Sequence, residues 1–394
     1  MDAAPDRRPL RIALVAGEAS GDLLGGELVQ ALRERYPNAH FAGVGGLQMR
    51  DAGVDIWYDS ALLSVMGLFE VLRHLPRLLR LRRRLRIQLL QWQPDLFIGI
   101  DAPDFNLGLE RKLKQAGIRT VHYVSPSIWA WRQDRARKIA KSVDRVLCLF
   151  PMEPPIYARY GVDAVFVGHP MARKFPLQPD RAAARAALGL PADTKVLAML
   201  PGSRLGEIER LWPIFAEAAR LLGERIPGLM VAVPAATPQC RAAIEKHLMA
   251  SGQRNIGLFD GRAHEVMIAA DVVLLASGTA ALEAMLAKRP MVVGYRIAAL
   301  SYRILMAFGI LKVERYSLPN VLANEPIVPE LMQHDCTPEN LCAAVLHWFE
   351  HPDECATLQP RYAYIHERLR GERSAADAIA ELLPRVEGGV AGHR

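Results

Sequence analysis

The sequence predicts a doubly wound α/β protein made of two similar halves. Short apolar runs rich in β-branched residues alternate with helix-forming stretches, the pattern of βαβ units that share a parallel sheet. The alternation stops at a proline-rich connector, residues 176–179, and then starts again. At 394 residues the chain also exceeds one ordinary hydrophobic core. We therefore expect an N-terminal domain of residues 1–175, a second domain of residues 176–345, and C-terminal helices from 346 to 394.

The expected strands are short apolar runs, as strands buried on both faces require. They lie at residues 11–16, 40–44, 96–100, 120–124, 146–149 and 164–167 in the first half, and at 196–200, 230–233, 255–258, 272–276 and 291–293 in the second. The loop after the first strand, residues 17–22, lacks the GxGxxG spacing of a dinucleotide site. A two-domain dehydrogenase is therefore disfavoured.

The composition narrows the class of protein. Hydrophobic residues make up 51% and charged residues 23%, which is ordinary for a globular chain. No apolar run approaches the roughly 18 to 20 residues of a spanning helix, and the five scattered cysteines suggest neither disulfides nor a zinc site. We expect a reduced, cytosolic protein. The net charge of +7 indicates an anionic partner, which could be nucleic acid, a phosphorylated substrate or an anionic membrane.

The stretch from Leu62 to Leu90 departs from the alternation. Its first part is a dense apolar cluster, and seven arginines follow between Arg73 and Arg86. If Pro76 opens a helix, the helical period places one stripe of arginines opposite a leucine-rich side on which Arg82 and Arg86 intrude. The arginine stripe comprises Arg73, Arg77, Arg80 and Arg84, and the other side carries Leu75, Leu78, Leu85 and Leu89. This composition suits the surface of an anionic bilayer. The alternative is an ordinary amphipathic helix packed on the sheet, with solvated arginines.

Two turns in the second half are candidates for binding phosphate. Ser277-Gly278-Thr279 joins an expected strand to helix-forming sequence, and a helix N-terminus presents unpaired N–H groups and a positive dipole end. Glu283, one turn further, could accept hydrogen bonds from sugar hydroxyls. The alternative is a plain helix that Ser277 or Thr279 caps. Leu200 to Arg204 forms a second such turn, in which Arg204 could clamp a phosphate.

The first half offers a candidate base. Asp101 follows the expected strand 96–100, and ligands of open α/β sheets bind where strands end. A carboxylate there could act as a general base, while Asp104 is expected to cap the next helix. The loop from Ser125 to Arg132 carries two tryptophans, which could line a sugar or acyl pocket or anchor the loop. His122 precedes it and fits a core histidine better than a catalyst.

Seven motifs together resemble the lipid-A-disaccharide synthase family, glycosyltransferase family 19. They occur in that family's order and are GEASGD (17–22), GIDAPDFN (99–106), HYVSPSIWAWR (122–132), LPGSR (200–204), LASGTAALE (275–283), MVVGY (291–295) and SLPN (317–320). The resemblance implies a GT-B glycosyltransferase, with two Rossmann-like domains facing across a cleft and C-terminal helices that cross back to the first. It also implies transfer of 2,3-diacylglucosamine from UDP to the 6-hydroxyl of 2,3-diacylglucosamine 1-phosphate, with inversion.

The resemblance also implies a role for individual residues. The UDP-binding residues would be Arg204, Ser277, Gly278, Thr279, Glu283 and Asn320, and the catalytic base would be Asp101. We expect no cofactor and assign no metal ligand, although whether a cation assists stays open at this point. The resemblance places the enzyme on the cytoplasmic face of the inner membrane as a peripheral protein. The apolar cluster would supply the membrane contacts, which we assign to Val65, Met66, Leu68 and Phe69.

Two other functions remain open at this stage, and so does a homodimer. The first is another GT-B enzyme that uses a UDP-sugar, such as a UDP-N-acetylglucosamine 2-epimerase, which would not need the apolar cluster. The second is a nucleic-acid-binding protein that contacts phosphates through the arginines of residues 73–86. The apolar cluster argues against nucleic acid as a partner, because it offers nothing to a duplex backbone.

Overall fold

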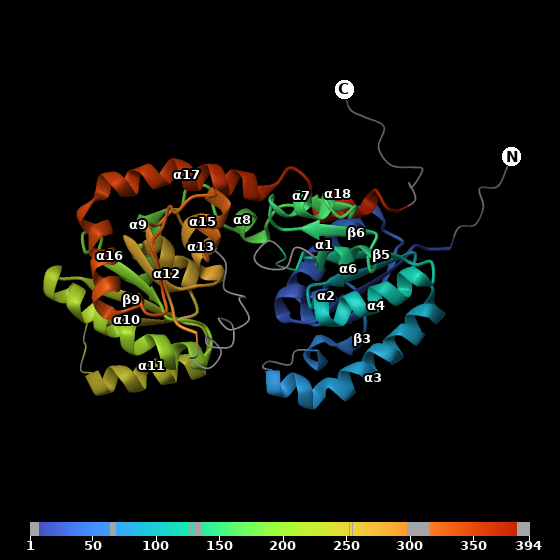
Figure 1. Cartoon of the computed structure of the whole chain (residues 1–394), viewed down its shortest axis with the longest axis horizontal. Coiled ribbons are helices and arrows are strands. Elements are labelled where there is room, and N and C mark those ends of the chain that lie inside the picture. The colour runs from blue at the N-terminus through green and yellow to red at the C-terminus, as the bar shows by residue number, and fades with distance from the viewer. Residues whose placement is uncertain are drawn as a thin grey trace, which may run out of the picture. The chain divides into compact units, whose positions relative to one another are not determined.

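The protein is described here by a computed structural model covering residues 8–63, 68–126, 128, 135–251, 253, 255–297 and 315–383, with the backbone alone at 68–74, 250 and 251. The chain divides into two compact units, residues 1–170 with 371–394 and residues 171–370. Each unit is built on a parallel sheet with helices packed against it (Figure 1). The expectation of two doubly wound α/β halves is therefore confirmed.

The first unit contains a seven-stranded sheet in the order β3-β2-β1-β4-β5-β6-β7. Its elements are β1 (Arg11–Ala16), α1 (Ala19–Arg35), β2 (His40–Gly45), α2 (Leu47–Asp51), β3 (Asp55–Asp59), a 3-10 helix (Ser60–Leu62), α3 (Leu68–Trp92), β4 (Leu96–Ile100), α4 (Pro103–Gln115), β5 (Arg119–Tyr123), α6 (Arg135–Ala140), β6 (Arg145–Cys148), α7 (Glu153–Ala158), β7 (Ala164–Phe166) and α18 (Ala375–Ala380). The order of the strands reverses between β1 and β4, which is the point where open α/β sheets bind ligands.

The second unit contains a six-stranded sheet in the order β10-β9-β8-β11-β12-β13. Its elements are α8 (Pro170–Lys174), α9 (Arg181–Leu188), β8 (Val196–Leu200), α10 (Leu205–Arg225), β9 (Met230–Ala235), α11 (Pro238–Ser251), β10 (Ile256–Asp260), α12 (Ala263–Ala269), β11 (Val272–Ala276), α13 (Thr279–Leu286), β12 (Met291–Tyr295), α15 (Leu318–Ala323), β13 (Glu330–Met332), α16 (Pro338–Glu350) and α17 (Pro352–Arg370). Here the order reverses between β8 and β11.

Eleven strands lie where the apolar runs predicted them, and two were missed. The central strands β1, β4, β8 and β11 are buried along almost their whole length, so their sequences are continuous apolar runs. The missed strands β3 and β13 lie at the ends of their sheets and are partly exposed. A strand at the edge of a sheet is covered on fewer sides, so its sequence carries a weaker hydrophobic signal.

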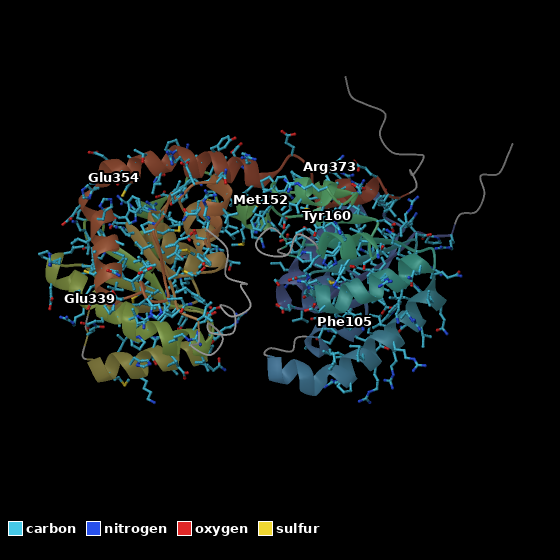
Figure 2. All side chains as sticks on the ribbon, viewed as in Figure 1. Phe105, Met152, Tyr160, Glu339, Glu354 and Arg373 are labelled. Atoms are coloured by element: carbon cyan, nitrogen blue, oxygen red, sulfur yellow. The ribbon has the colours of Figure 1, made fainter. Side chains whose placement is uncertain are left out.

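Helix α3 packs beside α4 on one face of the first sheet (Figure 1). Leu85 and Leu89 of α3 are fully buried in a cluster with Phe97 of β4, and Phe105 of α4 packs against the same cluster (Figure 2). The helix begins at Leu68, so the expectation that Pro76 opens it was wrong. Pro76 lies inside the helix on an exposed stretch, and an interior proline costs about 3 kcal/mol of helix stability, which tertiary packing offsets.

Across the described residues, no helix is both long enough and apolar enough to span a bilayer.

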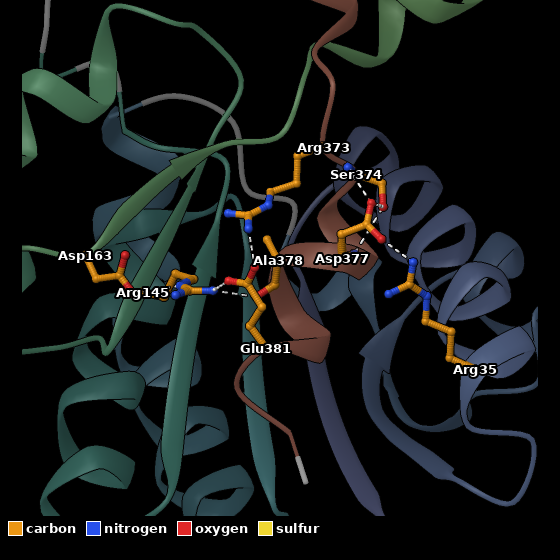
Figure 3. A network of polar contacts seen from close by, with 8 residues as sticks. All are labelled: Arg35, Arg145, Asp163, Arg373, Ser374, Asp377, Ala378 and Glu381. Carbon is orange, nitrogen blue, oxygen red and sulfur yellow. Dashed lines mark hydrogen bonds and ion pairs between the residues drawn. The ribbon is translucent and has the colours of Figure 1, made fainter. Parts of the chain in front are cut away.

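The chain returns to the first unit at residue 371, and α18 anchors it there. Ala376 and Ile379 enter the core beside α1, while Asp377 caps the helix through Ser374 and pairs with Arg35 of α1 (Figure 3). Arg145 of β6 donates to the Ala378 carbonyl oxygen and to Glu381, each at 2.7 Å. Sequence analysis grouped residues 346–394 together. In the structure α16 and α17 belong to the second unit, and the part from 371 onward belongs to the first.

A buried carboxyl group lies at the start of α7. Glu153 is 1% exposed, and its Oε2 accepts a hydrogen bond from the Phe150 backbone N–H at 3.1 Å. Burial raises the pKa of Glu153 from its usual 4.5 to about 7, because the charged form loses its hydration. The folded protein therefore binds this proton more tightly than the unfolded chain does.

We expect Glu153 to make the stability of the first unit depend on pH. Its contribution is fully present below about pH 4.5 and is lost as the pH rises through about 7; the shift corresponds to roughly 3 kcal/mol. Thermal unfolding at pH 5 and pH 8 should therefore show a larger loss of stability in the wild type than in Glu153→Gln. Glu372→Gln, at an exposed position of the same unit, serves as the control and should follow the wild type. Parallel pH profiles for all three proteins would contradict this assignment.

Candidate functional site

A cavity of about 780 Å³ opens at the carboxyl ends of the strands of the second sheet. Residues that follow β8, β9, β10 and β11 line it, and it lies where the strand order reverses. Five of the six residues that the sequence predicted for UDP line this cavity, namely Arg204, Ser277, Gly278, Thr279 and Glu283. Parallel pairing explains this convergence, because it brings the ends of distant strands to one edge.

The turn after β11 leaves the start of α13 uncapped by side chains. Gly278 is the N-cap residue, and neither Ser277 nor Thr279 makes a capping hydrogen bond. The plain capped helix considered from the sequence is therefore wrong. Gly278 has φ +156 and ψ −156, a conformation that side chains disfavour. The N–H groups at the start of α13 remain available to an anion in the cavity.

The turn after β8 brings a second helix N-terminus to the cavity. Arg204 is the N-cap residue of α10, and its side chain is 70% exposed, with Nη1 3.6 Å from Oε1 of Glu207. The Ser203 N–H donates to Oε2 of Glu207 at 3.1 Å. Gly202 has φ +132, and a Cβ at this position would lie 2.6 Å from the Cβ of Glu207. Glycine is therefore required for the turn to approach its own helix so closely.

Sequence analysis missed His264, which also lines the cavity. Its Nε2 lies 3.2 Å from Oε2 of Glu283, and its ring packs against Phe175 with 4.6 Å between ring centroids. This pair fixes the Glu283 carboxylate at the cavity wall. The signal that could have revealed it is the turn Gly261 to His264, which follows an expected strand as the other two turns do.

The structure does not bring Asn320 to this cavity. Asn320 is 2% exposed and lines a different cavity of about 700 Å³, beside Glu330. Its Oδ1 accepts from the N–H groups of Ile327 and Val328, and its Nδ2 donates to the Val328 carbonyl oxygen and to Glu330. The polar atoms of Asn320 therefore bind the chain itself, and its contact with UDP stays a prediction.

Asp101 lies where β4 ends, at the point where the strand order of the first sheet reverses. Asp101 and Ala102 have φ of +52° and +43°, two consecutive left-handed residues that are not glycine. The Asp101 N–H donates to the Tyr123 carbonyl oxygen at 2.8 Å, and the side chain is half-buried. Such strain persists only where the surroundings enforce it, and it concentrates at functional sites.

Asp104 does not cap α4, contrary to expectation. The helix begins at Pro103 with Ala102 as its N-cap residue, because proline favours the first helical position. The Asp104 side chain is 98% exposed and lies 3.7 Å from Arg135. Of the two carboxylates in this motif, only Asp101 is held at the end of a strand.

Several other predicted residues fall outside the described part of the chain. They are Val65 and Met66 of the apolar cluster and both tryptophans of the loop after β5, while Leu68 and Phe69 are described by their backbone alone. Ser125 at the start of that loop is buried and hydrogen-bonds the hydroxyl of Tyr157 at 3.0 Å. His122 is fully buried, as expected for a core histidine.

One group of described side chains could hold a metal ion. The ligand atoms of His347, His351 and Glu354 lie within 4.8 Å of one another at the corner between α16 and α17; Glu354 is labelled in Figure 2. His347 already pairs with Glu354 at 2.9 Å, and none of the three lines the candidate cavity.

The candidate cavity is built from two helix N-termini, an arginine and a carboxylate. These groups suit a sugar linked to a diphosphate.

The family model and the curated relatives agree on one family. A family model described as lipid-A-disaccharide synthetase matches residues 12–382. The chain is 62% identical over 388 residues to the lipid-A-disaccharide synthase of Xanthomonas axonopodis pv. citri (strain 306), covering 98% of this chain and 88% of that protein.

Two solved structures share the fold. The UDP-GlcNAc 2-epimerase of Neisseria meningitidis bound to UDP-GlcNAc superposes with a TM-score of 0.62 at 13% identity, covering 94% of this chain and 99% of that one. The glycosyltransferase of kitacinnamycin superposes with a TM-score of 0.62 at 18% identity, covering 96% of this chain and 100% of that one. At these identities the likeness bears on the fold alone, which is GT-B.

Proposed function

This chain belongs to the lipid-A-disaccharide synthase family, and from that premise we propose how its residues carry out the reaction. It is a glycosyltransferase of lipid A disaccharide synthesis, with a UDP-sugar and a phosphorylated glucosamine lipid as substrates. The full reaction that we propose joins UDP-2,3-diacylglucosamine to 2,3-diacylglucosamine 1-phosphate and releases UDP. The observation that carries the residue assignments is the meeting of two motif turns, after β8 and β11, at one cavity.

The donor binds in the cavity of the second unit. The diphosphate lies against the N-termini of α10 and α13, where N–H groups and helix dipoles favour negative charge. Arg204 is exposed enough to reach a phosphate, and a charge-assisted contact there would stabilise UDP as the leaving group. Glu283, which His264 holds in place, accepts hydrogen bonds from sugar hydroxyls of the nucleotide.

The acceptor hydroxyl needs a base, because a neutral alcohol is a poor nucleophile. Asp101 takes the proton of the 6-hydroxyl as its oxygen attacks the anomeric carbon of the donor. The new C–O bond forms while the bond from that carbon to the diphosphate breaks, and the electron pair leaves with UDP. Attack from the side opposite the leaving group inverts the configuration and gives the β-1,6 linkage. A positioned base of this kind typically contributes about 10²- to 10⁴-fold in rate.

The reaction takes place at a membrane surface, because its lipid substrates reside there. Besides its buried face, α3 carries Leu75, Leu79, Ile87 and Leu90, which are between 38% and 45% exposed. Their spacing places them along one side of the helix together with the exposed Arg83, and the exposed Arg77, Arg80 and Arg84 lie beside this side. We include this stripe with Val65, Met66, Leu68 and Phe69 in the proposed contact with the cytoplasmic face of the inner membrane.

The two alternatives from the sequence have less support. The epimerase fold is shared, but 13% identity to that structure compares with 62% identity to a lipid-A-disaccharide synthase. A nucleic-acid-binding protein would use the arginines of α3 against phosphates, yet exposed leucines lie among them.

Arg204→Ala should weaken UDP binding more than it affects folding. Loss of one charge-assisted contact costs about 1.5 to 3 kcal/mol, which corresponds to roughly 10- to 150-fold in affinity. Isothermal titration calorimetry with UDP measures this, and Arg220→Ala, at an exposed position of the same helix, is the matched control. An unchanged UDP affinity in a folded Arg204→Ala variant would remove Arg204 from the site.

Asp101→Asn keeps the shape of the side chain and removes its basicity. We expect a folded protein that binds UDP normally and turns over at least about 10²-fold more slowly. Mass analysis of the products from both lipid substrates measures the turnover. Asp104→Asn, three residues away and fully solvated, should turn over like the wild type. Near-normal turnover of Asp101→Asn would place the base elsewhere, with Glu18 the next residue to test.

Replacing the proposed membrane contact should release the protein from lipid vesicles. Leu79→Ser with Ile87→Ser removes two exposed apolar side chains and should weaken binding to anionic vesicles about 10-fold or more. Val65, Met66, Leu68 and Phe69 changed together to serine should have a larger effect, and activity on dispersed short-chain substrates should survive in both. Leu47→Ser with Met249→Ser, also at exposed positions, is the control. Unchanged vesicle binding, or an unfolded variant, would count against the contact.

A further inference from the structure

The strained turn at Asp101 and Ala102 is held from beneath by a buried side chain. Asn106 is fully buried on the first turn of α4, and its Nδ2 lies within hydrogen-bond distance of three carbonyl oxygens. They belong to Val15 at 3.2 Å, Ile100 at 3.3 Å and Asp101 at 2.8 Å. One amide group therefore ties α4 to the ends of β1 and β4 and to the turn itself.

A second buried polar pair lies one helical turn further along α4. Glu110 is fully buried, and its Oε1 lies 2.7 Å from Nδ1 of His122, which is also fully buried on β5. His122 is the partner of Gly99 in the register of β4 and β5. A Cβ on Gly99 would lie 2.1 Å from Oε1 of Glu110 and 2.9 Å from the Cβ of Asn106. Glycine at position 99 therefore makes room for both side chains, which are neighbours against the same strand.

These three side chains leave polar atoms without partners. Within the described residues, Oδ1 of Asn106, Oε2 of Glu110 and Nε2 of His122 are buried and make no hydrogen bond. An unpaired buried polar group is costly, so a cluster of three in one place calls for an explanation.

A protonated Glu110 would remove part of this cost. Burial raises the pKa of Glu110, and its pairing with His122 only partly opposes the shift. A neutral carboxylic acid can donate a hydrogen bond. Asn106 and Glu110 lie four residues apart on α4 and both border Gly99, which is the placement that a hydrogen bond from a protonated Oε2 to Oδ1 of Asn106 requires. The two unpaired oxygens then satisfy each other.

We propose that Glu110, held by His122, acts as a neutral hydrogen-bond donor that fixes Asn106, and that Asn106 in turn fixes the backbone turn that presents Asp101 to the acceptor. Glu110, His122 and Asn106 are positioning residues on this account, because none of them touches substrate. The proposal rests on the proposed role of Asp101 as the base. A purely structural role would change only the stability of the protein. The positioning role proposed here also changes the rate of the chemical step.

Substitutions at Glu110 test the proposal. Glu110→Gln keeps the shape, the acceptor for His122 and a donor toward Asn106, so its kcat should stay within about twofold of the wild type. Glu110→Leu removes both and should lower kcat by about 10- to 100-fold with little change in KM, because displacing a catalytic group by about 1 Å costs up to roughly 10²-fold. Leu113→Ala, one turn further on α4, should lower the melting temperature without lowering kcat. Asn106→Ser carries the same expectation as Glu110→Leu and replaces it if that variant does not fold.

A double-mutant cycle with Asp101→Asn separates failure of this proposal from failure of the proposed base. If Glu110 acts through Asp101, Glu110→Leu should add little to the loss already caused by Asp101→Asn. A slow Asp101→Asn variant in which Glu110→Leu costs its full factor again would overturn the positioning role alone. Normal turnover of Asp101→Asn would overturn the base itself. Equal losses of kcat in Glu110→Gln and Glu110→Leu, or a fall in melting temperature with unchanged kcat in Glu110→Leu, would also overturn the proposal.

Discussion

The parallel pairing of the strands is the constraint on which the site depends. In each sheet all the paired strands run in one direction, so their carboxyl ends lie along one edge. The turns at Arg204 and Ser277 are more than 70 residues apart in the chain. They line one cavity because the pairing of their strands brings them together, and they need no direct contact with each other. The reversal of strand order leaves room at that edge, because the connections on either side of it run in opposite directions. In the first sheet Asp101 lies at the corresponding reversal point, between β1 and β4.

The turns at the carboxyl ends of both sheets contain residues with unusual backbone angles. Gly202 and Gly278 adopt backbone conformations that other residues disfavour, and each lies at the end of a central strand. In the first unit the strain falls on Asp101 and Ala102, which are not glycines. Holding them costs about 1 to 3 kcal/mol each, so the surrounding hydrogen bonds must exceed that cost. The bond from the Asp101 N–H to Tyr123 and the contacts of Asn106 are the interactions that do so.

The sequence could predict the central strands and five residues of the cavity because each depends on local information. A strand buried on both faces is a continuous apolar run, and a phosphate-binding turn is short and contiguous. The misses depend on tertiary surroundings instead. His264 lies at the cavity beside a carboxylate 19 positions away, a pairing that no local pattern reveals. Asn320 turns its polar atoms toward Val328 and Glu330, and its contact with UDP stays a prediction. Pro76 and Asp104 misled because proline at a first helical turn and aspartate at a cap are preferences that packing can override.

Helix α3 shows why periodicity alone could not separate structure from membrane binding. The sequence suggested one apolar stripe opposite one arginine stripe. Either packing on the sheet or contact with a membrane could explain it.

In the structure the apolar residues divide between two faces of the helix. Leu85 and Leu89 pack against the sheet, while Leu75, Leu79, Ile87 and Leu90 face outward. The core therefore accounts for only part of the hydrophobic pattern. Packing within the first unit does not explain four large apolar side chains along one outward side of α3, and this observation supports the proposed membrane contact. The arginines beside them add positive charge that an anionic bilayer would attract, so both features of the helix agree with the proposed contact.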